Sequence, residues 1–89
     1  MIKRGKLEII KDILKIIQEN HNLIKPTPLL RKSNMSSTRF KEYFNELKEK
    51  QLIIETKKEK SKQIALTEKG NRFLERYHTM INFIEEFEL

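Results

Sequence analysis

Apolar residues recur at helical spacing near both ends of the chain. The segment between them is more polar, and its apolar residues form shorter runs. Residues 6–19 carry two adjacent apolar stripes. The stripes consist of Leu7, Ile10, Leu14 and Ile17, and of Ile9, Ile13 and Ile16. One stripe is enough for a helix to join a small core, so the second predicts a further surface to cover. Two partners fit equally, the C-terminal helix of the same chain or another subunit.

A short connection and a short helix are predicted next. Pro26 and Pro28 each push the preceding residue away from helical angles, so the chain is extended here, and residues 23–25 are a candidate for a short edge strand. Thr27 is then a suitable N-cap. Pro28 fits the first helical position, where its missing N–H costs no intrahelical hydrogen bond. The pattern predicts a helix over residues 28–32.

A tight turn and a second amphipathic helix follow. In the turn, residues 33–35, Asn34 is suited to left-handed angles and Met35 to a place between the two helices. Ser36 is the predicted N-cap of a helix over residues 36–50. Its inward side chains are Phe40, Phe44 and Leu47, with Tyr43 at the edge of that face. Its outward side chains are Ser37, Thr38, Lys41, Glu42, Asn45 and Lys48. Hydroxyl, amide and cationic groups of this kind suit base edges and phosphates.

A β-hairpin is predicted after this helix. Residues 52–56 and 62–66 are rich in β-forming side chains and flank a polar turn over residues 57–61. Four lysines lie at or beside the tip: Lys57, Lys58, Lys60 and Lys62. Lysines can simply protect an exposed hairpin edge from pairing with other chains. Four lysines beside a single glutamate are more than edge protection requires. Contact with phosphates is therefore the preferred interpretation.

The last segment predicts a long helix that is capped by Thr67 and spans residues 68–87. Its apolar side chains follow the spacing of a coiled-coil seam: Phe73, Tyr77, Met80, Ile84 and Phe87, widened by Leu74 and Ile81. Three turns would close a small core, so the part from Met80 onward predicts an antiparallel or crossed homodimer. The alternative is a monomer in which this helix folds back over residues 6–19. Gly70, one turn into the helix, indicates a close backbone contact.

Composition and charge favour a polyanionic partner. The 89 residues suffice for one domain, which we expect to comprise a body over residues 1–66 and a dimerisation helix over residues 67–89. The formal net charge is +6 and the sequence pI about 9.7. Residues 1–66 hold 16 basic and 8 acidic side chains, whereas residues 67–89 hold 3 and 5. The basic body is therefore the part expected to face the polyanion.

Several classes of function are disfavoured. The chain has no cysteine, which fits a reducing cytosol, and no apolar stretch long enough to cross a membrane, so a cytoplasmic protein without membrane association is expected. His21, in a loop, and His78, on the outer face of the last helix, have no third ligand at matching spacing. Phosphate-binding and nucleophile motifs are missing from the sequence. Neither enzymatic activity nor a metal, cofactor or small-molecule substrate is expected.

The chain resembles a known family in the runs KLEIIKDILKII, RKSNMSSTRFKEYFNELKEKQLI and ALTEKGNRFLERY. It looks like the small archaeal winged helix-turn-helix proteins described as predicted transcriptional regulators, some of which dimerise through a C-terminal antiparallel coiled coil. The resemblance implies a mainly α fold with a small β-wing and a long C-terminal helix. It matches Ser36, Ser37, Thr38, Arg39 and Lys41 to the start of the recognition helix and Lys58 and Lys60 to the wing tip. Gln51 departs from the family, which usually has glycine there.

These observations predict binding to double-stranded DNA, with helix 36–50 in the major groove and wing 57–62 on phosphates. Ser36 and Ser37 would meet a phosphate at the helix N-terminus, while Thr38, Lys41 and Asn45 would reach base edges. Arg39, nearer the side of the helix, would grip the backbone. Both a sequence-specific regulator and an architectural protein, nucleoid-associated if the source is archaeal, remain open.

Two rival functions come from other classes. A winged helix can serve as a protein-interaction module, for which exposed apolar residues on helix 36–50 or the hairpin would be expected; the sequence predicts essentially none. RNA binding would call for stacking aromatics, and both Tyr43 and Tyr77 are expected to belong to helix faces.

Overall fold

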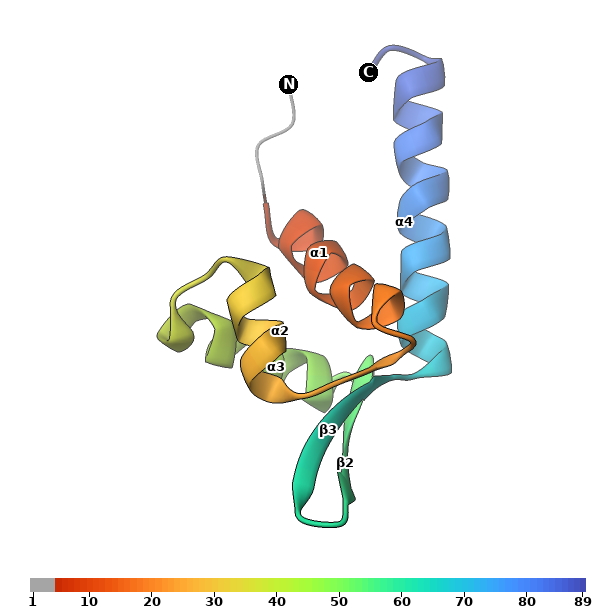
Figure 1. Ribbon diagram of the computed structural model, residues 1–89. Coiled ribbons are helices and arrows are strands. Elements are labelled where there is room, and N and C mark those ends of the chain that lie inside the picture. Colours follow the sequence, from red (N-terminus) through yellow and green to blue (C-terminus); the bar gives the residue numbers. More distant parts are fainter. Residues whose placement is uncertain (1–4) are drawn as a thin grey trace.

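Four helices and three short strands make up the computed structural model, which describes residues 5–89 (Figure 1). The elements in chain order are α1 (Lys6–Glu19), β1 (Leu23–Ile24), α2 (Pro26–Ser33), α3 (Ser37–Glu49), β2 (Ile53–Lys58), β3 (Ser61–Leu66) and α4 (Glu68–Glu86). The predicted fold class, mainly helical with a small β-wing and a long last helix, is confirmed. The first four residues of the expected 1–66 body lie outside the described residues.

Helix α1 is the centre of the core. Its two apolar stripes are both used within the chain, because α2, α4, β1 and β3 all pack against this helix. The buried side chains of α1 are Ile9, Ile10, Ile13, Leu14 and Ile17. The second stripe was expected to contact either the same chain or another subunit. The structure shows that the same chain covers most of this stripe. Leu7 remains outside this packing and is 52% exposed.

The three strands form an antiparallel sheet in the order β1-β3-β2. The short edge strand expected near residue 23 is present and pairs with β3. The hairpin pairs without interruption from Ile53 opposite Leu66 to Lys58 opposite Ser61, which leaves a loop of two residues. The predicted five-residue turn was wrong because Glu59 adopts a left-handed φ of 59°, and a positive φ in a two-residue loop matches the twist of the strands.

Helix α2 begins two residues before the predicted start. Lys25 is its N-cap, with extended angles and no side-chain hydrogen bond, and Pro26 takes the first helical position. Thr27 lies inside the helix, so its predicted role as cap was wrong. Pro28 is tolerated in the first turn because the N–H groups there have no intrahelical acceptor.

Helix α3 has the predicted N-cap, and its C-terminal end has a left-handed residue although Gln51 stands where the family usually has glycine. At its start, the Arg39 N–H donates to the Ser36 hydroxyl oxygen at 3.2 Å. At its end, the Leu52 N–H donates to the carbonyl oxygen of Leu47 at 2.9 Å, and Gln51 adopts a left-handed φ of 63°. This is the Schellman arrangement that usually contains glycine. The left-handed cap survives the departure from the family pattern.

Helix α4 starts at the predicted cap, since the Thr67 hydroxyl oxygen accepts a hydrogen bond from the Gly70 N–H at 3.0 Å. The predicted close contact at Gly70 is confirmed: a Cβ there would overlap the carbonyl oxygen of Leu52. Phe73 and Leu74 pack against the core, and the second half of α4 extends past α1 (Figure 1). The wing and the C-terminal end of α4 lie at opposite ends of a molecule that measures 49 × 26 × 21 Å. Within residues 5–89, no helix is long and apolar enough to span a membrane.

Candidate nucleic-acid interface

The exposed face of α3 is set by the side chains that the helix buries. Phe40 and Leu47 are 7% and 0% exposed and face the core. Thr38 and Asn45 lie on the opposite side, both exposed and seven residues apart, so they share one line along the helix. Glu42 and Glu49 are exposed on the same outer side of α3. The line of Thr38 and Asn45 matches the prediction that hydroxyl and amide groups face outward.

One flank of α3 faces the wing. The ammonium group of Lys48 lies 2.6 Å from a carboxylate oxygen of Glu55 on β2, and this ion pair joins the helix to the hairpin. The same ammonium lies 4.8 Å from the centre of the Phe44 ring. Lys41 is seven residues before Lys48 and therefore on the same flank, where it is exposed. Lys48 is engaged within the protein, whereas Lys41 is available to a ligand.

The wing lysines divide between the two faces of the hairpin. Successive side chains of a strand point to opposite faces, so Lys57 shares a face with Glu55, and Lys62 lies directly opposite Lys57. The pKa of Glu55 is lowered by the hydrogen bond from Lys48 and further by the charge of Lys62, which agrees with this placement. Lys58 points to the other face, and Lys60 lies in the turn. Lys57 and Lys62 thus lie on the face of the hairpin that the ion pair of Glu55 with Lys48 turns toward α3.

Like charges directly opposite each other destabilise a hairpin, so the pairing of Lys57 with Lys62 has no structural benefit. Both side chains are exposed, at the end of the molecule furthest from the tip of α4. An anion between them would remove the repulsion.

The other flank of α3 faces the beginning of α1. Glu46 accepts from Lys6 at 2.8 Å and lies 3.6 Å from Lys50, and the hydrogen bond from Lys6 holds the pKa of Glu46 below its usual value. Arg39 and Glu42 line a shallow hollow on this flank, together with Lys6, Tyr43 and Glu46. The guanidinium of Arg39 lies 6.0 Å from the centre of the Tyr43 ring. The prediction that Arg39 sits toward the side of the helix agrees with this position.

The last turn of α2 contributes two cations that sequence reasoning did not assign to the site. Arg31 and Lys32 are exposed, and only residues 34–36 separate α2 from α3. They therefore lie near the start of α3 along the chain, and Lys32 lines a hollow beside Asp12 and Glu19 of α1. Two consecutive basic residues just before the helix-helix turn were the signal that could have identified them.

One expectation about the surface was wrong. The hairpin does expose an apolar side chain, since Ile54 on β2 is 48% exposed. Ile54 and Leu23 both pair with Ala65, and these three residues form a short apolar row on the sheet face opposite Glu55. The face of the sheet that Ile54 occupies depends on the strand register, so its exposure could not be predicted from the sequence.

The predicted dimerisation residues fall into two groups. Phe73 packs against the core, and Tyr77 stacks on Phe73 at 6.3 Å and lies 5.6 Å from the ammonium of Lys11. Further along α4, Ile81 and Ile84 are half-buried, whereas Met80 and Phe87 are 38% and 57% exposed. Sequence reasoning missed Phe83, which is 55% exposed and in contact with Phe87 at a ring distance of 5.0 Å.

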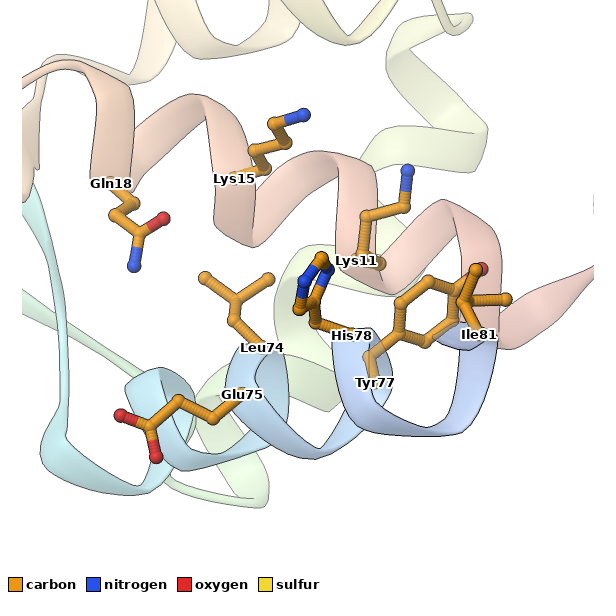
Figure 2. Close-up of a pocket in the computed structure, with 8 residues that line it drawn as sticks. All are labelled: Lys11, Lys15, Gln18, Leu74, Glu75, Tyr77, His78 and Ile81. Carbon is orange, nitrogen blue, oxygen red and sulfur yellow. The ribbon is translucent and has the colours of Figure 1, made fainter. Parts of the chain in front are cut away.

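A groove between α1 and α4 is the largest hollow described, and Figure 2 shows the side chains that line it. Leu74, Tyr77 and His78 face α1 across the groove, so the prediction that His78 lies on the outer face of the last helix was wrong. The ammonium group of Lys15 points away from α4, whereas that of Lys11 lies 5.6 Å from the centre of the Tyr77 ring. Within residues 5–89, no group of three or more His, Cys, Asp or Glu side chains could hold a metal ion.

The arrangement of two helices around a tight turn followed by a β-hairpin can be compared with known proteins. The family model of winged helix-turn-helix proteins matches residues 3–85. The chain belongs to the winged helix-turn-helix family. In the terms of this family, α2 and α3 are the helix-turn-helix pair, α3 is the recognition helix, and β2 and β3 form the wing.

A solved structure has a similar fold. The crystal structure of Sso10a-2, a DNA-binding protein from Sulfolobus solfataricus, superimposes with a TM-score of 0.76. The match covers 96% of this chain and 86% of that chain at 20% sequence identity. Identity at this level shows the winged-helix fold and leaves the ligand of this chain open. No curated protein matches the chain.

Proposed function

We propose that this winged-helix protein binds double-stranded DNA and acts as a transcriptional regulator without catalytic activity. The ion pair between Lys48 and Glu55 carries the proposal, because it sets the hairpin beside the recognition helix. Lys41 on α3 and the paired Lys57 and Lys62 on the wing then lie on the flank and the hairpin face that this ion pair joins. The net charge of +6 and the structural similarity to a DNA-binding protein support the same ligand.

In this proposal the N-terminal half of α3 enters the major groove, whose width of about 12 Å admits a helix. Thr38, Lys41 and Asn45 reach base edges, and Asn45 has the paired donor and acceptor that suit adenine. The Ser36 oxygen already accepts the capping hydrogen bond, but its hydroxyl proton is free to meet a phosphate together with Ser37. Arg39, the wing lysines and the newly assigned Arg31 and Lys32 contact phosphates.

The proposal includes a homodimer formed by the distal part of α4. Met80, Phe83 and Phe87 expose large apolar surfaces there, and Ile81 and Ile84 are half-buried beside them. Exposed apolar patches of this kind mark interaction sites. The end of α4 lies opposite the wing, so a second copy would pack there without covering the wing.

Fluorescence anisotropy tests the proposal. A labelled random duplex is titrated with the protein over a salt series, and the titration is repeated with single-stranded DNA and duplex RNA. Duplex DNA should bind, with an affinity that falls steeply as salt rises. A variant with Lys57→Ala and Lys62→Ala should lower the salt slope by about two units, at about 0.9 per phosphate contact. The matched control, Arg72→Ala with Arg76→Ala on exposed positions of α4, should change the slope less.

A protein-interaction role is the second candidate, and the apolar row of Leu23, Ile54 and Ala65 favours it. The same titrations separate the two functions. Absence of duplex binding at low salt would contradict DNA binding and favour protein docking. If DNA binding is correct, Ile54→Ser should leave the affinity for duplex unchanged.

A further inference from the structure

The exposed face of α4 changes in character along the helix. Its first half carries three cations at intervals of three and four residues: Lys69, Arg72 and Arg76. Its second half continues the same line with three large apolar side chains: Met80, Phe83 and Phe87. Residues at these intervals share one side of a helix. The face is therefore basic at the end next to the sheet and apolar at the end far from it (Figure 1).

A hollow of about 320 Å³ lies at the basic end of this face. Leu52, which follows α3, and Phe73 supply its apolar lining, and the three cations complete it. Within residues 5–89, neither Arg72 nor Arg76 has an ion-pair partner. The hollow therefore suits an apolar side chain that is accompanied by a carboxylate.

The far end of α4 has this complementary chemistry. Residues 77–89 contain three glutamates and neither lysine nor arginine. Phe87 is 57% exposed, and the centres of its ring and the Phe83 ring are 5.0 Å apart. Glu86 directly precedes Phe87, is exposed and has no ion-pair partner in the described part of the chain. The two ends of one helix face therefore complement each other.

Two copies of α4 can match these ends only in antiparallel orientation, because a parallel pair would set cations against cations. With a two-fold axis at Met80, Phe87 of one copy lies opposite Phe73 of the other, since each is seven residues from Met80. Arg72 and Glu86 are then offset by two residues, about 3 Å along the helix. Fourteen residues, about four turns, separate these two in the chain, so they share one edge of the face, and the axis brings equal edges together.

We propose that the hollow at the base of α4 receives Phe87 of a second copy, and that Arg72 pairs with Glu86 of that copy. The two-fold axis repeats this contact, so each dimer contains it twice. This inference rests on the proposed homodimer and adds its orientation and its register. It also extends the interface beyond α4, because Leu52 belongs to the segment between α3 and β2.

Charge reversal tests the ion pair by sedimentation equilibrium. Arg72→Glu alone, or Glu86→Arg alone, turns two attractive pairs per dimer into two repulsive ones. Each should raise the dimer dissociation constant about ten-fold or more. A chain with both changes again has opposite charges and should dimerise nearly as tightly as the native chain. An equimolar mixture of the two single variants should associate as well, because the mixed dimer has both pairs intact.

Glu85→Arg is the matched control for Glu86→Arg. Glu85 is exposed one residue earlier and lies about 100° away around the helix. The control makes the same change in charge and should alter the dissociation constant less. Urea unfolding of every variant shows whether the fold is kept.

A second pair of variants tests the hollow. Phe87→Lys should weaken the dimer more than Phe87→Glu, because the lining carries three cations. Asn82→Lys and Asn82→Glu, made on an exposed position off this face, measure the effect of net charge alone. A difference at Phe87 no larger than the difference at Asn82 would overturn the placement of Phe87 in the hollow.

The outcomes separate the contact from the homodimer. A native dimer that tolerates both single reversals would overturn the pairing of Arg72 with Glu86 and leave the homodimer standing. A parallel dimer would behave in this way, because each reversal replaces one contact between like charges with another. A folded double variant that does not recover association would overturn the pairing as well. A monomeric native chain would contradict the homodimer itself, and the contact with it.

Discussion

The carbonyl oxygen of Leu52 accepts a hydrogen bond from the Thr67 backbone N–H at 3.2 Å, and the Thr67 hydroxyl shares its one proton between this oxygen at 3.0 Å and the carbonyl oxygen of Gln51 at 2.7 Å. Leu52 follows α3 and Thr67 caps α4, so this contact joins the end of α3 to the start of α4. Gly70 packs against the same carbonyl. The junction has no room for an additional carbon atom.

Replacement of Gly70 by alanine should therefore destabilise the protein, although alanine is the better helix former by about 1 kcal/mol. The added Cβ would overlap the Leu52 carbonyl and press on the Leu66 side chain. Overpacking of this kind costs about 1–3 kcal/mol. Urea unfolding measures the change, with Thr79→Ala on the exposed side of α4 as control. An unchanged or higher unfolding free energy would show that the junction can relax.

Replacement of Gln51 by glycine should stabilise the protein. The residue has a φ of 63°, and left-handed angles cost a residue with a Cβ about 1–2 kcal/mol. Glycine removes this strain but gains freedom in the unfolded chain, so a net gain of about 0.5–1 kcal/mol is expected. The urea midpoint should rise while the slope m stays constant. Gln51→Ala is the control, because alanine keeps the strain.

The sequence was most informative where the signal was local. The caps Ser36 and Thr67, the left-handed Asn34 and the long apolar periodicities of α1 and α4 depend on residues within one or two turns of each other, and all were predicted. Most of the errors concern features set by register or by distant packing, whereas the start of α2, where Lys25 rather than Thr27 is the N-cap, is a local error. The orientation of His78 depends on how α4 rotates against α1, and the exposure of Ile54 depends on the strand pairing. Lys57 and Lys62 lie on one face of the hairpin and Lys58 on the other. This placement could be predicted only with the length of the turn, in which Glu59 adopts left-handed angles.

The ion pair between Lys48 and Glu55 should make stability depend weakly on pH. The hydrogen bond from Lys48 lowers the pKa of Glu55, so the folded state favours the carboxylate. This contribution is present above the pKa of an unfolded glutamate and is lost as the pH falls through the lowered value. Both side chains are about one-third exposed, so the effect should be less than about 1 kcal/mol.

Thermal unfolding of the native chain and of Glu55→Gln measures this dependence. The variant should be less stable at neutral pH, and the difference should disappear at acid pH, where both chains carry a neutral group at this position. Glu75→Gln serves as control, because the described part of the chain has no ion-pair partner for Glu75. A difference that persists at acid pH would mean that the glutamate stabilises the wing through packing rather than charge.

Self-association through α4 should depend on the apolar surface of its distal half. Ile84→Asp and Phe83→Asp each place a charge among side chains that a second copy would bury, and an unpaired buried charge is strongly unfavourable. Sedimentation equilibrium should give a dimer for the native chain and the monomer mass of 10.8 kDa for either variant. Phe83 distinguishes the exposed seam from the side of α4 that already packs on α1, since Phe83 is 55% exposed and Ile84 is only half-exposed.

A matched control is available one residue away. Asn82 is exposed on α4 between the half-buried Ile81 and the exposed Phe83, and a rotation of about 100° separates neighbouring residues of a helix. Asn82→Asp adds the same charge to the same turn but points away from the line of Met80, Phe83 and Phe87. It should leave the dimer intact. A monomeric native chain at micromolar concentration would contradict the dimer, and dissociation by Asn82→Asp would show that net charge, rather than burial at the seam, controls association.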